Sequence, residues 1–177
     1  MERPTGNIVS WLDQIVGASA EYLKVEERGN TIHVAHWRDR PPGLSLFATI
    51  GLSVSTLSEP PTELLLTVES PQLEWGYAMG FIAAQARGRF DFAIGETIDF
   101  RAKISPDSDM SAFVIVPQMM LPDSYSRVEF DTGTIELRQL VPIYDDELRA
   151  IRTRGPAFFA HQHPDVADVH RDRVALQ

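Results

Sequence analysis

The stretch from Leu137 to Glu147 constrains the fold most, because the signals of a buried strand and of a helix start follow each other directly in it. Apolar residues alternate along residues 134–143, and Leu140 on the opposite face indicates that this strand is buried on both sides. The acidic run from Asp145 to Glu147 then favours the positive end of a helix dipole. We therefore expect a central strand that passes directly into a helix and closes a core with the sheet before it.

Period-two patterns predict the rest of the sheet. Residues 62–69 show the cleanest alternation, with Leu64, Leu66 and Val68 on one face, and this predicts a half-buried strand of an antiparallel sheet. Gly29 and Asn30 can supply the positive φ angles of a tight hairpin turn. Further strands are expected at residues 21–27, 31–37, 46–52, 96–102, 112–116 and 128–130.

Helical spacing of apolar residues predicts the helices that cover this sheet. Residues 8–16 carry one apolar stripe, with Asn7 as the N-cap and Gly17 as the stop. Residues 71–89 carry a wide apolar face, which is typical of a helix that lies across a sheet. Residues 156–161 are expected to add one turn after the helix that follows the central strand.

These elements predict an α+β fold in one domain spanning residues 1–177, with a mostly antiparallel (mixed) sheet flanked by helices. The ordered core is expected over about residues 7–161. Residues 162–177 are charged and poor in large apolar side chains, so we expect a loosely ordered tail whose end frays.

The acidic balance of the chain narrows the class of partner. The formal net charge is -9 and no basic cluster interrupts it, which argues against nucleic acid and anionic membranes. A basic protein partner fits this charge, because complementary fields speed encounter, although solubility alone would also explain it. The absence of cysteine, of a signal peptide and of a transmembrane stretch predicts a cytoplasmic protein without disulfides or thiolate metal sites.

Catalytic signatures are missing from the sequence. There is no phosphate loop and no dinucleotide fingerprint, and Ser53 lacks the second glycine of a nucleophile elbow. His33 and His36 stand three apart on a predicted strand and therefore face opposite sides. We expect no catalytic residue and no cofactor.

Two other groups could hold a metal in principle. Asp107 and Asp109 could begin a calcium loop, but the glycine and glutamate that such a loop needs are absent. The C-terminal histidines and aspartates could bind zinc only on a rigid frame, and a loosely ordered tail does not supply one. We therefore expect neither group to form a metal site. The C-terminal group consists of His161, His163, Asp165, Asp168 and His170.

Asp145, Asp146 and Glu147 form the densest acidic cluster. Consecutive helix positions splay around the axis, so these carboxylates do not converge as an acid/base pair would. Helix capping and contact with a basic partner both remain open for them.

Three stretches together resemble the suppressor of fused domain family. These are the threonine-x-glycine-x-serine pattern Thr49 to Ser53, the glycine-acid step Gly95-Glu96 before an aliphatic and an aromatic residue, and the strand-to-helix segment that ends in Glu147-Leu148. With the strand that begins at Glu63, the resemblance runs from about residue 34 to about residue 171.

The resemblance implies a protein-binding module and not an enzyme. The animal member of the family grips a short segment of the Gli transcription factors as an added strand and has a further C-terminal domain, whereas stand-alone bacterial relatives are expected to be immunity proteins that neutralise toxins. The acid of the glycine-acid step contacts ligand in the animal protein, which assigns that role to Glu96. An aromatic residue that also contacts ligand there corresponds to Gln85, a departure from the family pattern.

We therefore expect a non-catalytic module that neutralises a partner toxin, most simply a basic toxin domain, by stoichiometric binding. A regulatory adaptor without inhibitory role and an enzyme with a site assembled from distant residues remain alternatives, and the oligomeric state is open. The candidate partner-binding residues are Glu96, Asp107, Asp109, Asp145 and Asp146.

Overall fold

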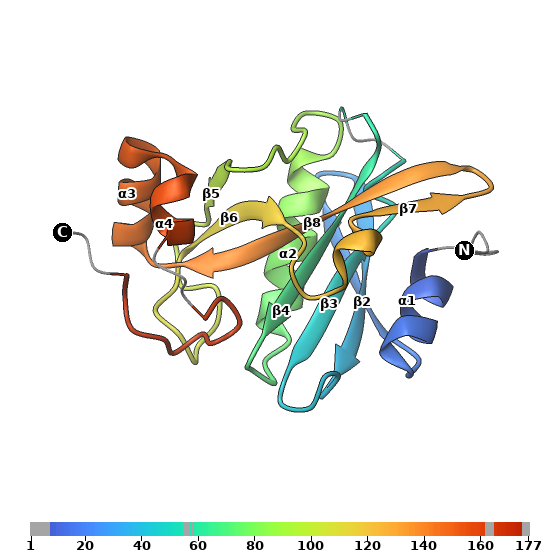
Figure 1. The fold of residues 1–177 in the computed structure, drawn as a ribbon, viewed down its shortest axis with the longest axis horizontal. Helices are drawn as coiled ribbons and strands as arrows, with labels where there is room; N and C mark the ends of the chain where they lie inside the picture. Colours follow the sequence, from blue (N-terminus) through green and yellow to red (C-terminus); the bar gives the residue numbers. More distant parts are fainter. Residues whose placement is uncertain (1–7, 55–56, 58, 162–164, 175–177) are drawn as a thin grey trace.

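The computed structural model describes residues 8–54, 57, 59–161 and 165–174, and they form one mixed sheet flanked by helices (Figure 1). The strand order is β1-β2-β3-β4-β8-β6-β5, and β7 pairs with β8 off this path. The strands are β1 Glu21–Glu27, β2 Asn30–Arg38, β3 Ser45–Ile50, β4 Thr62–Val68, β5 Thr97–Asp99, β6 Ala112–Pro117, β7 Arg127–Phe130 and β8 Gly133–Ile143. The helices are α1 Ile8–Val16, α2 Glu74–Ala86, the short 3-10 helix η1 Asp123–Tyr125, α3 Asp145–Arg154 and α4 Pro156–His161.

Strand β8 is the predicted central strand, and it joins the two halves of the sheet. Its residues Glu136–Leu140 pair parallel with β4, whereas Arg138–Ile143 pair antiparallel with β6 and Gly133–Glu136 with β7. Helix α3 begins two residues after β8 ends, as the acidic run predicted. All pairs except β4–β8 are antiparallel, so the mostly antiparallel mixed sheet is confirmed.

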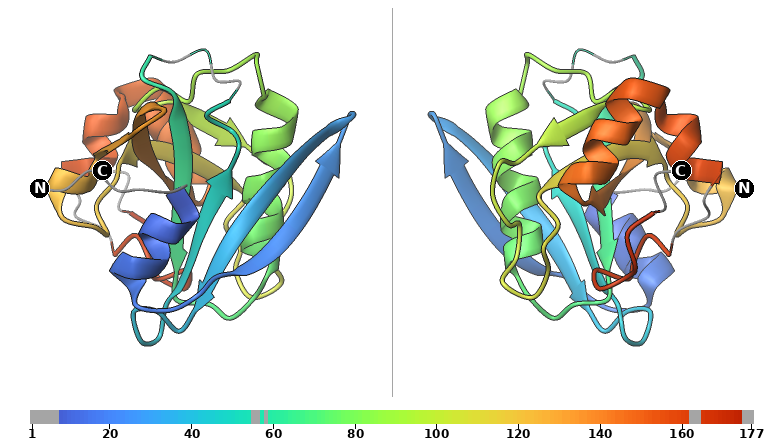
Figure 2. Two further views of the ribbon diagram at one scale, coloured as in Figure 1. Left: turned by 90° about the vertical axis from the view of Figure 1, so that its right-hand side faces the viewer. Right: turned by 90° about the vertical axis from the view of Figure 1, so that its left-hand side faces the viewer.

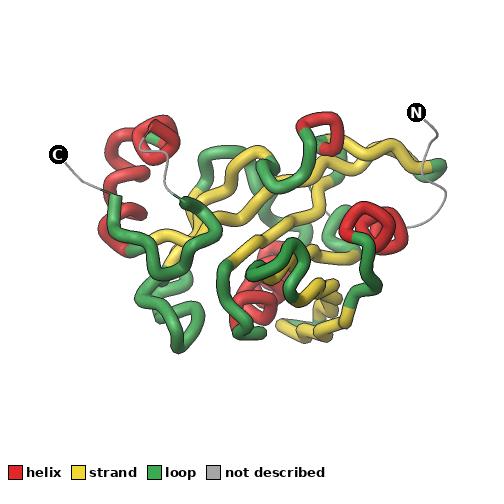
Figure 3. Tube along the Cα trace, turned by 60° about the horizontal axis from the view of Figure 1, so that its bottom comes forward, coloured by secondary structure: helices red, strands yellow, loops and turns green. Residues whose placement is uncertain are grey.

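Helices cover both faces of the sheet. Helix α2 packs on one face, where Leu64, Leu66 and Leu140 belong to its core, and α1 packs on the other, where Leu65 and Leu137 lie. Helices α3 and α4 bury the far end of β6 and β8 in a third cluster. Figure 2 (left) shows α1 and α2 on opposite sides of β3 and β4, and Figure 3 shows α3 and α4 at the other end of the molecule from α1.

The strand predicted at residues 62–69 is present as β4 and pairs antiparallel with β3, but the expectation that it is half-buried was wrong. Every residue of β4 is buried, including Glu63 and Thr67, which were expected to face solvent. Strand β4 lies between β3 and β8, pairs parallel with β8, and has helices on both faces. The alternation of polar and apolar residues therefore did not indicate an exposed face, because the polar side chains of Glu63 and Thr67 are buried as well.

The β1–β2 turn and β5 also differ from the prediction. The positive φ angles belong to Arg28 and Gly29, whereas Asn30 is already the first residue of β2 and donates its side-chain amide to the carbonyl of Ala84. Strand β5 has three residues and not the seven expected, because Arg101 adopts a φ of 62° and turns the chain away.

The expected loose tail was wrong for residues 165–174. Val169 and Arg171 are buried, and the backbone N–H of Glu69 donates to the carbonyl of Ala167 at 2.8 Å. Residues 162–164 and 175–177, and the expected N-cap Asn7, lie outside the described residues. Within the described part of the chain, no helix combines the length and apolar character needed to cross a membrane.

Candidate interaction surface

The threonine-x-glycine-x-serine pattern surrounds a buried carboxylate. The Glu63 carboxylate accepts hydrogen bonds from the Thr49 hydroxyl at 2.6 Å, from the Gly51 N–H at 2.9 Å, and from the N–H and hydroxyl of Ser53 at 3.0 and 2.7 Å. Burial raises the pKa of Glu63 although these hydrogen bonds oppose the shift. The pattern thus holds the turn after β3 to β4, and Ser53 is a structural donor.

The glycine-acid step shapes the loop before β5. Gly95 has a φ of 91°, and a Cβ added there would lie 2.8 Å from Cγ of Pro156, so both conformation and space require glycine. The Glu96 carboxylate accepts a hydrogen bond from the Ala93 N–H at 2.8 Å. Glu96 therefore closes its own loop with a half-buried side chain.

The strand-to-helix segment centres on Glu147, which is 1% exposed. Its carboxylate accepts the Tyr144 N–H at 3.0 Å, the Arg171 guanidinium at 2.8 Å and the Val174 N–H at 2.9 Å. The first of these bonds is the capping interaction that the acidic run suggested. The other two attach the C-terminal segment to α3, which local sequence patterns do not reveal.

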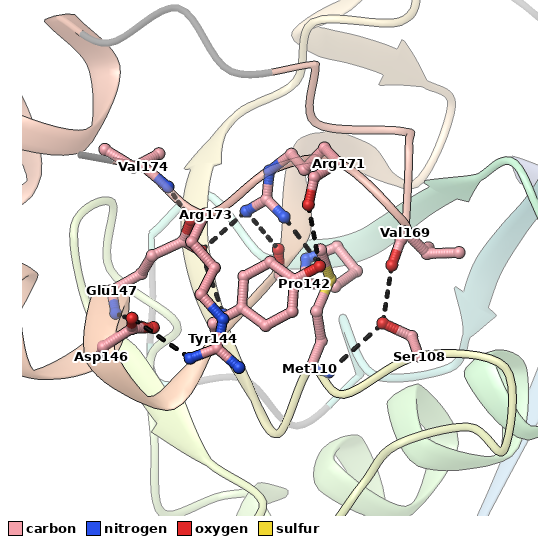
Figure 4. A network of polar contacts seen from close by, with 10 residues as sticks. All are labelled: Ser108, Met110, Pro142, Tyr144, Asp146, Glu147, Val169, Arg171, Arg173 and Val174. Atoms are coloured by element: carbon pink, nitrogen blue, oxygen red, sulfur yellow. Dashed lines mark hydrogen bonds and ion pairs between the residues drawn. The ribbon is translucent and has the colours of Figure 1, made fainter.

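Further contacts hold this C-terminal segment across the end of the sheet (Figure 4). The Tyr144 hydroxyl donates to the Arg171 carbonyl at 2.9 Å, and the Ser108 hydroxyl donates to the Val169 carbonyl at 2.7 Å. The Arg171 guanidinium also donates to the Pro142 carbonyl at 3.2 Å. Segment 165–174, loop 105–110 and the start of α3 thus form one interlocked frame.

Three predicted acids lie on this frame, and Asp107 is held most firmly. Its carboxylate accepts the hydroxyls of Ser70 and Ser105, each at 2.5 Å. Partial burial alone would raise the pKa of Asp107, but the hydrogen bonds from Ser105 and Ser70, with a smaller effect from His170, outweigh burial and lower it. Asp107 and Asp109 border a polar pocket of about 230 Å³ with Pro106, Ser108, Tyr144, Val169 and His170.

Asp146 joins this group through Arg173. The Arg173 guanidinium pairs with Asp146 at 3.2 Å and lies 4.8 Å from the centre of the Tyr144 ring. Asp109 pairs with Lys103 at 2.5 Å on the exposed side of the pocket. We define the acidic surface as Asp107, Asp109 and Asp146 around Tyr144.

The other two predicted acids lie apart from the acidic surface. Asp145 faces solvent on α3, where it pairs with Arg149 one helical turn later at 2.5 Å. Glu96 belongs to the loop before β5, as described above. The three consecutive acids that begin α3 therefore contact three different arginines, as their splay around the helix axis predicted: Arg149, Arg173 and Arg171.

The histidines that the structure describes do not gather into a metal site. His33 is exposed and His36 is buried against the Phe47 ring, with ring centres 4.4 Å apart, which confirms that they face opposite sides of β2. His163 lies outside the described residues. Among the residues that the structure describes, no three His, Cys, Asp or Glu side chains are placed to hold a metal ion.

Solved structures with the same fold come from suppressor of fused proteins. The structure described as the Sufu-Fu complex has a TM-score of 0.67 and 16% identity, over 93% of this chain and 89% of that one. A suppressor of fused homologue from Neisseria gonorrhoeae has a TM-score of 0.69 and 16% identity, over 95% and 94%. Drosophila Suppressor of Fused has a TM-score of 0.67 and 16% identity, over 94% of this chain and 50% of that chain.

A sequence identity of 16% to these structures shows only that the fold is shared. The family is shown by a match of the sequence to a family profile. No curated protein gives a significant match to this sequence. The sequence profile described as Suppressor of fused protein (SUFU) matches residues 28–172, which include all three patterns discussed above. The chain therefore belongs to the suppressor of fused family.

Proposed function

We propose that this protein is a non-catalytic binding module that inhibits a basic toxin domain by stoichiometric contact, as an immunity protein does in the cytoplasm. The observation that carries the proposal is the acidic surface, where Asp107, Asp109 and Asp146 border Tyr144 on an ordered frame. The Sufu-Fu complex supports the general part of the proposal, because a family member is bound there to another protein.

The frame makes the acidic surface suitable for binding. Asp107 is oriented by two serines, and Tyr144 is held by its hydroxyl bond to the Arg171 carbonyl. Side chains that are already positioned lose less conformational entropy on binding, so more of the contact energy appears as affinity. Carboxylates that bind arginine form strong, directional contacts, and arginine is a common anchor of protein interfaces.

The ion pairs of Asp109 and Asp146 do not prevent contact with a basic partner. Lys103 and Arg173 are 64% and 55% exposed at the side chain, so water already screens both pairs. A lysine or arginine of the partner can replace either cation at small cost, and the net charge of -9 attracts such a partner over a longer range.

The test begins with identification of the partner. Tagged protein is used to capture partners from the native host, and the association rate with the captured protein is measured over a range of salt concentrations. Asp109→Lys combined with Asp146→Lys should slow association at least tenfold at low salt, and the difference should shrink as salt screens the charges.

The matched control places the same charge change at the other end of the molecule. Asp123→Lys combined with Asp131→Lys alters exposed residues near β7, far from α3 (Figure 1). Equal slowing by both double variants would mean that only total charge matters and would remove the acidic surface from the proposal. Turnover of the partner into a chemically altered product would overturn the non-catalytic assignment.

A regulatory adaptor is the second candidate, and the Sufu-Fu complex favours it because a family member is associated there with another protein. The two candidates separate in one assay. An immunity-type protein abolishes the activity of the captured partner at a one-to-one ratio, whereas an adaptor binds it and leaves that activity in place.

A further inference from the structure

Strand β1 offers the longest unpaired edge among the described strands at the margins of the sheet. It ends the strand order, and its residues Glu21–Glu27 pair with β2 in an unbroken antiparallel register. Strands β5 and β7, which also have a free side, contain only three and four residues. Figure 2 shows the β1–β2 hairpin along one side of the molecule, beside α2. Proteins commonly shorten, bulge or cover such an edge, whereas β1 has seven residues and no bulge.

The β1–β2 turn determines which backbone groups lie on this edge. Both residues of the turn have positive φ angles, 49° and 79°, as in the two-residue hairpin turn that a hydrogen bond closes. The flanking residues Glu27 and Asn30 are therefore a hydrogen-bonded pair, and such pairs alternate along an antiparallel ladder. The N–H and C=O groups that point away from β2 consequently belong to Tyr22, Lys24 and Glu26. The structure shows no hydrogen bond to these groups within the described part of the chain.

The side chains of the same three residues face solvent. Tyr22 is 59% exposed, and the side chains of Lys24 and Glu26 are 60% and 63% exposed. Lys24 and Glu26 lie on one face of β1 and form an ion pair there. Water screens such an exposed pair, so a neighbouring strand can contact either charge at small cost. The edge therefore presents a positive and a negative charge two residues apart, beside unpaired backbone groups.

The order of charges along β1 selects one way of pairing two copies of the chain. In an antiparallel pair around a two-fold axis at Lys24, the two Lys24 side chains meet, and Glu21 lies opposite Glu27. A shift of the axis to Val25 removes both kinds of like-charge contact. Lys24 of each copy then lies opposite Glu26 of the other, and the two Val25 side chains meet on the α2 face. Opposite charges directly across an antiparallel pair stabilise it, whereas like charges destabilise it.

A lysine in the middle of an edge strand usually opposes pairing. In β1 the lysine opposes only the register centred on Lys24, because Glu26 provides the matching charge in the register centred on Val25. A register centred on Leu23 places Lys24 opposite Tyr22 and forms no ion pair between the copies. A register centred on Glu26 brings two glutamates together. Charge complementarity therefore favours the register centred on Val25.

We propose that β1 is the contact surface for a second copy of this chain, which adds its own β1 in the antiparallel register centred on Val25. The backbone N–H and C=O groups of Lys24 bond to those of Glu26 in the other copy, and the reverse pair forms by symmetry. The side chains of the same residues form a square of alternating charges. This proposal is independent of the proposed function, because no residue of the acidic surface belongs to β1.

Charge reversal tests the register. The dissociation constant of the dimer is measured by sedimentation equilibrium of the untagged protein. Lys24→Glu and Glu26→Lys should each weaken the dimer at least tenfold, because each places like charges opposite one another. The two variants change the net charge in opposite directions, so repulsion between whole molecules would not weaken both. In the register centred on Lys24, Lys24→Glu would only exchange one pair of like charges for another.

Two combinations of these changes should restore the dimer. The double variant, Lys24→Glu with Glu26→Lys, should associate within threefold of the wild type, because opposite charges again face each other. An equimolar mixture of the two single variants should form a heterodimer for the same reason. Arg149→Glu, a reversal in the exposed ion pair of α3, is the matched control and should change the dissociation constant less than twofold.

Amide hydrogen exchange tests the backbone contacts. The N–H groups of Lys24 and Glu26 should exchange more slowly as the protein concentration rises, because the dimer supplies their acceptors. The N–H groups of Leu23 and Val25 donate to β2 in the monomer as well, so their exchange should not depend on concentration.

Several outcomes would overturn the proposal. Wild-type protein that stays monomeric at its highest soluble concentration would do so, as would a dimer that both single reversals leave unchanged. A double variant no stronger than the single variants would show that the β1 charges do not face each other. If the wild-type protein stays monomeric while a captured partner protein slows exchange at Lys24 and Glu26, the edge accepts a strand of that protein and the assignment to a second copy is wrong.

Discussion

The carboxylate of Glu147 and the guanidinium of Arg171 form a buried ion pair of 2.8 Å that joins the first turn of α3 to the C-terminal segment. Their side chains are 1% and 5% exposed. A family pattern at the start of a helix and a residue near the end of the chain are therefore parts of one structural unit, and the acidic surface rests on it.

Removing one partner of this pair should be costly. Arg171→Met is expected to lower the free energy of unfolding by about 3–5 kcal/mol, because it leaves the Glu147 carboxylate buried without its cation. Urea unfolding measures the change. The double variant with Glu147→Gln should recover part of the loss, and the exposed neighbour Arg173→Met should cost less than about 1 kcal/mol. Similar losses for Arg171→Met and Arg173→Met would contradict the role of the pair.

Glu63 should make stability depend on pH. Its pKa is raised above the ordinary 4.5, mainly by burial. The stability that protonated Glu63 contributes is therefore fully present below pH 4.5, and it is lost as the pH rises through the pKa of the folded state. Glu63→Gln stays neutral, and its unfolding free energy relative to wild type should increase from about pH 4 to about pH 8. The exposed Glu69→Gln should show no such trend. A difference between Glu63→Gln and wild type that is independent of pH would refute the prediction.

The Thr49 hydroxyl should be essential to the same cluster. It donates to Glu63 at 2.6 Å and accepts the Leu64 N–H at 2.8 Å. Thr49→Val removes the side-chain acceptor of the Leu64 N–H and one of the four hydrogen bonds to the Glu63 carboxylate. It should cost about 2–4 kcal/mol, at ~1–3 kcal/mol for each lost buried hydrogen bond with partial relaxation. Thr49→Ser, which retains the hydroxyl, should recover most of the loss in a thermal or urea denaturation experiment.

His36 should have the opposite pH dependence. Burial, followed by the charge of Arg38, lowers its pKa from 6.5, while Glu21 opposes the shift. Its stability contribution is therefore complete above 6.5 and is lost as the pH falls through the folded pKa, because the buried ring must take up a proton. His36→Phe should flatten the acid limb of the stability curve. His33→Phe, on the exposed face of the same strand, should leave that limb unchanged.

Gly80 should not tolerate the substitution that usually favours helices. A Cβ at this position of α2 would lie 2.5 Å from Cγ2 of Val25, so Gly80→Ala should lower the unfolding free energy by about 1–3 kcal/mol through overpacking. Glycine to alanine in an open helix would instead stabilise by about 1 kcal/mol. Adding Val25→Ala should relieve the clash. A double variant no more stable than Gly80→Ala alone would show that the loss has another cause.

Local patterns predicted much of the fold. The stripe of residues 8–16, the wide face of α2 and the alternating apolar residues of β8 each follow from a periodicity that neighbouring residues share. The acidic start of α3 was also predictable, because capping involves residues three apart. The sequence suggested five candidate acids, but local patterns could not determine which of them lie close together.

The tertiary structure decided the remaining features, because they depend on residues far apart in the chain. Glu63 looked like a solvent-facing residue, but β4 lies between β3 and β8, and the turn after β3 encloses Glu63 beside Thr49 and Ser53. The C-terminal segment looked too polar to be ordered, yet Arg171 inserts into a site built by Glu147 and Pro142. The amino-acid sequence determined where strands and helices form through local periodicity, whereas long-range pairing alone decided which polar groups are buried and which acids meet.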